Sequence, residues 1–175
     1  FRSGKRKSQD LLAFERSRED NLLLLQSQLS DKSYKPGLYK CFYINDPKVR
    51  LIHKASIRDR VVHHVVSKKL ETIFEPLFIS HSYSCRKNRG THRGMRDLIK
   101  LAGSVSRNNT KPCYALKCDI KKFFASVDHS LLISILETNV SDPDFLALLK
   151  LIIRSFNSGT SGIGLPIGNL TSQYF

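Results

Sequence analysis

An aspartate at the end of a short apolar segment is the clearest candidate for chemistry in this sequence. Residues 113–118 predict a short buried strand, and Asp119 follows at its carboxyl end. Ligand crevices commonly form where strands end, and a carboxylate there can bind a divalent metal because hard cations prefer oxygen ligands. The alternative is an aspartate that ends the strand by turn chemistry. The residue and its position alone allow both interpretations.

The densest basic stretch is a second candidate. Residues 82–96 combine arginines and lysine with two glycines and a tyrosine, before the first acidic residue at Asp97. Positive charge on a flexible turn suits the phosphate backbone of a nucleic acid. A solvated loop is the alternative, and the excess of one sign of charge favours phosphate binding. The basic residues concerned are Arg86, Lys87, Arg89 and Arg93.

Two β signals joined by a turn predict a hairpin with basic residues near its tip. Residues 41–44 and 49–53 are the strands, residues 45–48 are the turn, and Lys48 and Arg50 lie close to it. Charges on a hairpin are usually solvent-exposed. A mobile basic hairpin can equally clamp a triphosphate, because arginine offers a planar fork of donors.

Helices and a glycine-rich segment complete the predicted architecture. Apolar spacing, caps and proline positions predict helices over residues 8–30, 57–74, 91–106, 129–137 and 142–156. Val61 and Val65, with Val62 and Val66 as further candidates, are expected to face the core from the second of these together with Leu70, Ile73 and Phe74. Glycines between 159 and 168 allow close backbone approach to a ligand, and a helix is expected after Gly168. All four cysteines are interpreted as reduced packing residues.

Composition narrows the class of protein. The chain has 29 Lys and Arg against 15 Asp and Glu, a net charge of +14, and 41% hydrophobic residues. It is therefore able to build a core, and its charge favours a polyanionic partner, with nucleic acid ahead of an anionic membrane surface. Without an apolar run of about 18 residues or an apolar signal core, we expect a cytoplasmic protein that is not inserted in a membrane.

Four separated blocks resemble the reverse transcriptases of bacterial retroelements, in the group II intron-like superfamily. They are Arg50-Leu-Ile-x5-Arg58-Asp-Arg-Val-Val-His-His, Phe78-Ile-Ser-x-Ser-Tyr-Ser-Cys-Arg-Lys-x-Arg-Gly-Thr-His, Asp119-Ile-x-x-Phe-Phe, and Gly164-Leu-Pro-Ile-Gly-Asn-Leu-Thr-Ser-Gln. The resemblance covers roughly residues 36–175. It implies an α+β fold: the fingers and partial palm of a right-hand polymerase, with helices packed on a small antiparallel sheet. The implied domains are a basic helical extension (1–35), fingers (36–112) and the first part of the palm (113–175).

The resemblance also implies a mechanism, the transfer of a nucleotide from a dNTP to a primer 3′-hydroxyl. Two Mg²⁺ ions about 3.5–4 Å apart, or Mn²⁺ in their place, would activate the hydroxyl and stabilise the leaving pyrophosphate. Asp119 would bridge the metals, with the Ile120 carbonyl as a further ligand. Phe124 would exclude a ribose 2′-hydroxyl, although a core phenylalanine is the alternative.

The same resemblance assigns basic residues to the phosphates. Arg50 and Lys48 would bind the triphosphate, and Arg58 with the 86–93 cluster would follow the template. Template RNA, primer, cDNA product and dNTP are the implied partners, together with an accessory RNA-binding protein. Asp128 is placed at the entry to a helix, where it would act as a cap.

The last block separates members of the superfamily. Many relatives carry Gln-Gly-x3-Ser-Pro where this chain has Ile167-Gly168-Asn-Leu-Thr-Ser-Gln. This departure is most similar to the reverse transcriptases of diversity-generating retroelements, which copy RNA with errors at adenines. An aliphatic Ile167 beside the nascent pair would weaken the selection of nucleotides, because polar complementarity discriminates more sharply than apolar fit. Gly168 would also contact the nucleotide.

One block of the family does not occur in this sequence. Tyr-x-Asp-Asp, which supplies the remaining metal carboxylates, is not found before Phe175. We therefore expect the protein to continue beyond this residue, and the 175 residues to be inactive alone. The alternative functions are a group II intron maturase and a catalytically inactive RNA-binding relative.

Overall fold

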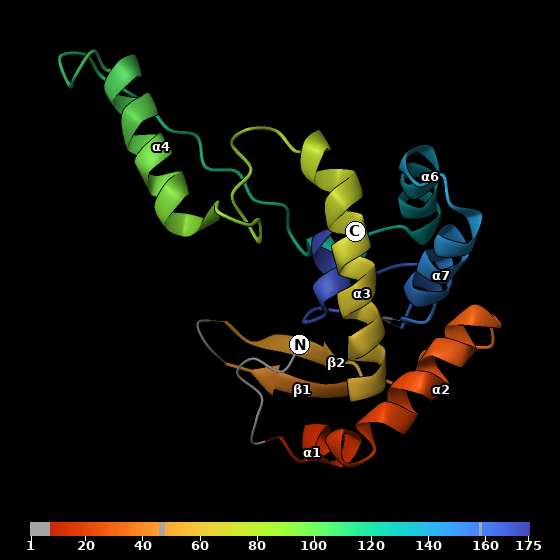
Figure 1. Cartoon of the computed structure of the whole chain (residues 1–175). Helices are drawn as coiled ribbons and strands as arrows, with labels where there is room; N and C mark the ends of the chain where they lie inside the picture. The colour runs from red at the N-terminus through yellow and green to blue at the C-terminus, as the bar shows by residue number, and fades with distance from the viewer. Residues whose placement is uncertain (1–7, 46–47, 158) are drawn as a thin grey trace. The chain divides into compact units, whose positions relative to one another are not determined.

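A computed structural model describes residues 8–45, 48–157 and 159–175 (Figure 1). The chain divides into two compact units: unit 1 comprises the described residues of Phe1–Glu71 and Lys122–Phe175, and unit 2 comprises Thr72–Lys121. The basic lead-in at residues 2–7 and part of the predicted hairpin turn, residues 46–47, lie outside the described residues.

The N-terminal part of unit 1 is helical. The predicted helix over 8–30 is instead two helices, α1 (Gln9–Arg16) and α2 (Arg18–Ser30), which meet at Ser17. Serine competes for backbone hydrogen bonds and favours such breaks. Leu11 and Leu25 are the buried anchors of the two helices.

The predicted hairpin is confirmed. Strands β1 (Lys40–Ile44) and β2 (Arg50–Lys54) pair antiparallel, with Phe42 opposite Ile52. Helix α3 (Ile57–Phe74) follows, as predicted, and buries Val62, Val66 and Leu70. The expectation that Val65 faces the core is wrong, because it lies on the exposed side of the helix, with 61% of its surface accessible.

The C-terminal part of unit 1 contains four further elements: α5 (Phe123–Ser126), α6 (His129–Asn139), α7 (Pro143–Arg154) and the 3-10 turn η2 (Leu170–Gln173). Asp142 accepts hydrogen bonds from the backbone N–H groups of Asp144 and Phe145, so the predicted capped start of α7 is confirmed. The helix predicted after Gly168 is only this single 3-10 turn. The short helix α5 was not predicted.

Unit 2 contains η1 (Glu75–Leu77) and α4 (Gly90–Val105), which agrees with the predicted helix over 91–106. The buried strand predicted over 113–118 is wrong: this segment has no regular structure, and Tyr114 and Leu116 are 93% and 91% exposed. A strand requires a partner for its backbone groups, and the described residues form only the β1–β2 ladder.

The four cysteines are free, as predicted, but none of them packs in a core. Cys41, Cys85, Cys113 and Cys118 are all exposed. Cys113 and Cys118 are exposed because residues 113–118 do not form the buried strand that was predicted there. Among the described helices, none has both the length and the apolar character needed to cross a membrane.

Candidate functional site

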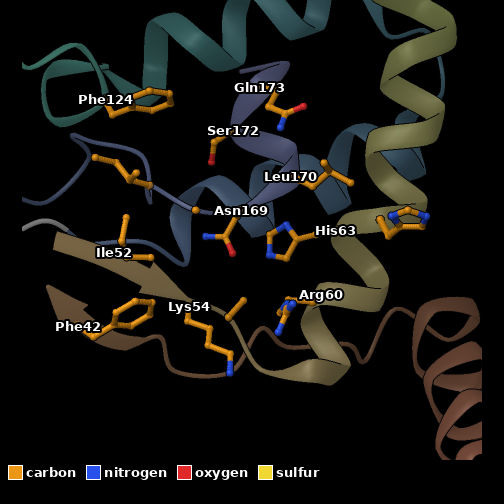
Figure 2. A pocket seen from close by; sticks show the side chains of 14 residues that line it. Phe42, Ile52, Lys54, Arg60, His63, Phe124, Asn169, Leu170, Ser172 and Gln173 are labelled. Atoms are coloured by element: carbon orange, nitrogen blue, oxygen red, sulfur yellow. The ribbon is translucent and has the colours of Figure 1, made fainter. Parts of the chain in front are cut away.

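A cavity of about 650 Å³ opens in unit 1 between the hairpin, α3, and the C-terminal loop (Figure 2). Phe42 and Ile52 line it from the hairpin, and Arg60 and His63 line it from α3. Three predicted nucleotide-site residues, Phe124, Ile167 and Gly168, also line this cavity. Segments that are far apart in the sequence therefore meet at this cavity.

The glycine-rich loop is attached to β2 by its backbone. The His53 N–H donates to the Ile167 carbonyl (3.0 Å), and the Asn169 amide Nδ2 donates to the His53 carbonyl (3.1 Å). Gly168 has a φ of +106°, and a Cβ there would lie 2.9 Å from Ile52 Cγ2. Glycine is therefore needed both for the backbone conformation and for the close approach to the strand.

The same loop is attached to α3 by a buried side-chain pair. His63 Nδ1 lies 2.9 Å from Thr171 Oγ1. Burial lowers the pKa of His63, an effect that the nearby Asp59 carboxylate opposes. Within the loop, Ser172 Oγ donates to the Pro166 carbonyl at 2.8 Å. These bonds fix the wall of the cavity that carries Asn169 and Ser172.

Phe124 is held by the start of the same loop. The Leu165 N–H donates to the Phe124 carbonyl (2.7 Å), and the Gly164 N–H donates to the Val127 carbonyl (2.8 Å). His129 Nε2 donates to the Gly164 carbonyl at 2.7 Å. Asp128 accepts hydrogen bonds from the first N–H groups of α6, so the predicted cap is confirmed.

Cationic side chains lie along the same cavity. Lys54 and Arg60 line it, and Lys54 Nζ also bonds to Asp10 Oδ2 of α1 at 2.6 Å. That hydrogen bond lowers the pKa of the Asp10 carboxyl. An anionic ligand would therefore meet positive charge at this wall.

Arg58, a predicted template contact, is used internally in this structure. Its guanidinium donates to Gln28 Oε1 (2.7 Å) and the Lys35 carbonyl (3.1 Å), and it lies over the Tyr34 ring. Tyr34 in turn donates to the buried Asp59 (2.9 Å), and its pKa is raised by burial and by this carboxylate. The arginine thus joins α3 to the segment that follows α2.

Arg86 has a similar internal role in unit 2. It bonds to both oxygens of Glu75 and to the carbonyls of Ile79 and Ser82, and its side chain is only 7% exposed. This pairing lowers the pKa of the Glu75 carboxyl. A guanidinium has five N–H donors, and those of Arg86 meet the Glu75 carboxylate and the two carbonyls. These hydrogen bonds hold the loop around the arginine side chain.

The remaining members of the basic cluster are more accessible. Arg89 donates to the Ser80 carbonyl, and Arg93 donates to Asp97 at 3.2 Å. Lys87 is exposed.

Lys48 and Arg50 are exposed at the hairpin, where Arg50 pairs with Ile44 in the β ladder.

Asp119 and Ile120 lie in the exposed, irregular segment of unit 2. A carboxylate and a backbone carbonyl are oxygen donors of the type that Mg²⁺ prefers, and both residues are accessible to solvent. Over residues 8–45, 48–157 and 159–175, no group of three or more His, Cys, Asp or Glu side chains is arranged to hold a metal. The predicted metal ligands therefore fit in chemical type and supply one carboxylate.

Several cavity residues were not predicted as site residues: Phe42, Ile52, Lys54, His63, Asn169 and Gln173. Phe42 and Ile52 share one face of the hairpin, and this pairing follows from the register of the strands. In the sequence, His63 and His64 are adjacent and cannot share a metal from one helix face, which favours a structural or surface role for His63. Its long-range partner Thr171 carries no signal in the local sequence.

Comparison with known proteins places these residues in a family context. Residues 35–173 match the family described as "Reverse transcriptase (RNA-dependent DNA polymerase)". The match includes every residue of the cavity and all predicted site residues.

Individual proteins show the same similarity over most of the chain. A "Putative COX1/OXI3 intron 1 protein" of Saccharomyces cerevisiae is 26% identical over 85% of this chain and 18% of its own length. "Protein YkfC" of Escherichia coli is 28% identical over 82% of this chain and 37% of its length. The "Group II intron-encoded protein LtrA" of Lactococcus lactis is 24% identical over 81% of this chain and 22% of its length. The chain therefore spans well under half of each of these relatives.

Proposed function

Because the chain belongs to the reverse transcriptase family and resembles the enzymes of bacterial retroelements, we propose that the complete protein copies RNA into DNA. In this proposal unit 1 binds the incoming nucleotide, and the primer 3′-hydroxyl attacks its α-phosphate with release of pyrophosphate. The observation that carries the proposal is the cavity of unit 1, where Phe124, Ile167 and Gly168 meet within the matched region.

The size and lining of the cavity suit a nucleotide. Ligand pockets typically measure about 300–1,000 Å³ and combine apolar walls with a few placed polar groups. Phe42, Ile52 and Phe124 supply apolar surface, and Asn169 and Gln173 supply polar groups. We assign the Phe124 ring to exclusion of a ribose 2′-hydroxyl, which would favour dNTP over NTP.

Triphosphate and metal binding belong to the same proposal. Arg50 and Lys48 would reach the triphosphate from the hairpin, since both are exposed there. Asp119 and the Ile120 carbonyl would hold Mg²⁺, which neutralises charge on the phosphates when bound. The match covers only 18% of the Saccharomyces relative and 22% of the Lactococcus relative, and we propose that the complete enzyme provides the other carboxylates.

Template binding is assigned to the basic cluster of unit 2. Lys87 is the strongest candidate because it is exposed, and Arg89 and Arg93 can add charge beside it. Arg58 and Arg86 would have to give up internal hydrogen bonds to reach a phosphate. Their support for a template contact is correspondingly weaker.

The type of retroelement rests on two different observations. Ile167 in the cavity favours an error-prone enzyme of a diversity-generating retroelement, because an aliphatic side chain gives up a polar contact to the nascent pair. The name of the Lactococcus relative favours a group II intron-encoded protein. An RNA-binding protein without polymerase activity is the remaining alternative.

Primer extension with the complete protein tests the proposal. An RNA template with an annealed DNA primer should be extended with dNTPs in the presence of Mg²⁺, and NTPs should be used poorly. RNA binding without any extension would contradict polymerase activity and support the inactive relative. Error rates at template adenines and a splicing assay with intron RNA then separate the two retroelement types.

A further inference from the structure

The hydrogen bond between His63 and Thr171 joins two segments that are separated by 108 residues in the sequence. His63 belongs to α3 and Thr171 to the 3-10 turn η2, and the two residues are 3% and 1% exposed. Figure 2 shows the His63 ring projecting from α3 toward the segment that carries Asn169 and Leu170. His63 itself lines the cavity, and its buried partner Thr171 belongs to the turn that carries the wall residues Leu170, Ser172 and Gln173.

The other bonds of this wall act at different places. The Asn169 amide anchors the start of the segment to β2, and the Ser172 hydroxyl bonds to Pro166 within the loop itself. His63 provides the side-chain bond from α3 to the turn at Thr171. A buried donor or acceptor that loses its partner is costly, so the turn has one strongly preferred position against the helix.

We propose that His63 is a positioning residue for the nucleotide, acting through Thr171 on the wall formed by Asn169, Ser172 and Gln173. This inference rests on the proposed function, because it names what holds the nucleotide wall in place. Loss of the bond should loosen the turn, so that more binding energy is spent on ordering it when a dNTP enters. The nucleotide would then bind more weakly, while the reaction at the metal would proceed at a similar rate once the nucleotide is bound.

The competing interpretation is a buried histidine that only stabilises α3. Ser67, four residues after His63, provides a matched control on the same helix. Its hydroxyl is also buried, and it has no hydrogen-bond partner among the described residues. Ser67→Ala therefore changes a buried polar group of α3 without touching the wall of the cavity.

The experiment uses the complete protein with His63→Leu, Thr171→Val and the double variant, beside the conservative His63→Asn and Thr171→Ser. Asparagine places an amide atom near the position of Nδ1, and serine keeps the hydroxyl. We expect each disruptive single variant to raise KM for dNTP about 3- to 10-fold, the range of one hydrogen bond, with kcat changed less than about twofold. The double variant should raise KM by about as much as either single variant. His63→Asn, Thr171→Ser and Ser67→Ala should keep KM near the wild-type value.

Hydrogen exchange of the amides of residues 168–173, measured without nucleotide, gives a second readout that needs no polymerase activity. Faster exchange in His63→Leu and Thr171→Val, but not in Ser67→Ala, supports the positioning role even if the wild-type protein extends no primer. Unchanged exchange in folded His63→Leu overturns it. An unchanged KM, or additive effects in the double variant, would overturn it as well.

Discussion

The two units of the molecule differ in how they are held together. In the part of the chain that the structure describes, every hydrophobic residue of the buried core belongs to unit 1, including Leu70, Leu136 and Leu149. Unit 2 buries none, and its helix α4 leaves Met95 and Leu98 more than half exposed. Unit 1 therefore has the apolar burial that stabilises a fold, and unit 2 depends on polar bonds around Arg86 and Asp97.

This difference separates the predicted chemistry into two parts. The cavity to which we assign the nucleotide is built from hydrogen-bonded segments of unit 1, and the residues proposed for the metal and the basic cluster proposed for the template lie in unit 2. Substitutions in unit 1 should act through the shape of the cavity. Substitutions at exposed positions of unit 2 should act on chemistry or binding, with little effect on stability.

The largest effect is expected for Asp119→Asn in the complete protein. If Asp119 holds Mg²⁺ as proposed, a neutral amide would not replace its carboxylate as a ligand, so primer extension should be abolished. Asp119 is exposed, so the melting temperature and RNA affinity should stay close to wild type. Extension that persists in this variant would show that the metal ligand lies elsewhere, and a large loss of stability would break the comparison between the units.

Gly168→Ala should have the largest effect on the fold of unit 1. Alanine at a φ of +106° is strained, and its Cβ would collide with Ile52 Cγ2 at 2.9 Å. We expect a loss of about 1–3 kcal/mol from the backbone and a further loss of about 1–3 kcal/mol from the collision. Chemical denaturation measures the combined loss in the free energy of unfolding. Steady-state kinetics measures the accompanying change in KM for dNTP.

Gly159→Ala is the matched control for this substitution. Gly159 has a φ of +98°, but nothing lies within 4 Å of a Cβ there. Gly159→Ala should therefore lose only the about 1–3 kcal/mol that comes from the backbone conformation. Equal destabilisation by the two variants would mean that the close approach of Gly168 to Ile52 does not add to the cost.

Local patterns in the sequence predict the elements that depend on neighbouring residues. The caps at Asp128 and Asp142 satisfy the first N–H groups of their helices, and the hairpin follows from alternating β-formers around a turn. The family motifs also assign Phe124 and Ile167 to the nucleotide; the two residues line one cavity, and their role there stays a prediction. These features need no knowledge of distant contacts.

Features that depend on distant partners could not be predicted in this way. The strand expected at 113–118 has suitable residues, but strand formation requires a second segment to pair with it. The bond from His63 to Thr171 and the internal roles of Arg58 and Arg86 depend on which chain segments meet. A basic residue has the same local signal whether it binds a phosphate or a buried carboxylate.

Arg86 and Lys87 are adjacent in unit 2, and their substitutions separate an effect on the fold from an effect on RNA binding. Arg86→Ala should loosen the loop over residues 75–89, because a carboxylate and two carbonyls lose their partner. Faster amide exchange and earlier proteolytic cleavage there would measure the change. Lys87→Ala should leave both unchanged and lower RNA affinity, with a salt dependence shallower by about one counterion. The reverse pattern would reassign Arg86 to the template.

The stability of unit 1 should depend on pH through His63. Burial lowers its pKa below the ordinary value of about 6.5, and the nearby Asp59 acts in the opposite direction. Lys54 and Arg60 are the cationic residues that line the same cavity. The neutral histidine therefore stabilises the fold above about pH 6.5, and this contribution is lost as the pH falls through the lowered pKa.

Thermal unfolding between pH 7.5 and 5.5 tests this linkage. The melting temperature of the wild type should fall with pH, and His63→Asn should show a smaller fall because asparagine does not titrate. Burial lowers the pKa of His53 as well, so part of the dependence should persist in the variant. An identical pH dependence in the two proteins would exclude His63 as its source.

The smallest expected effect concerns fidelity rather than turnover. Ile167 lines the cavity with its side chain, while its backbone carbonyl accepts the bond from His53. Ile167→Gln should therefore keep the loop anchored and restore a polar contact near the nascent pair. We expect misincorporation opposite template adenines to fall about 3- to 10-fold, the range of one hydrogen bond, with kcat little changed. Ile167→Val, which stays aliphatic, should retain the wild-type error spectrum in sequenced cDNA. If glutamine and valine give the same spectrum, fidelity is set by the backbone of the loop and not by this side chain.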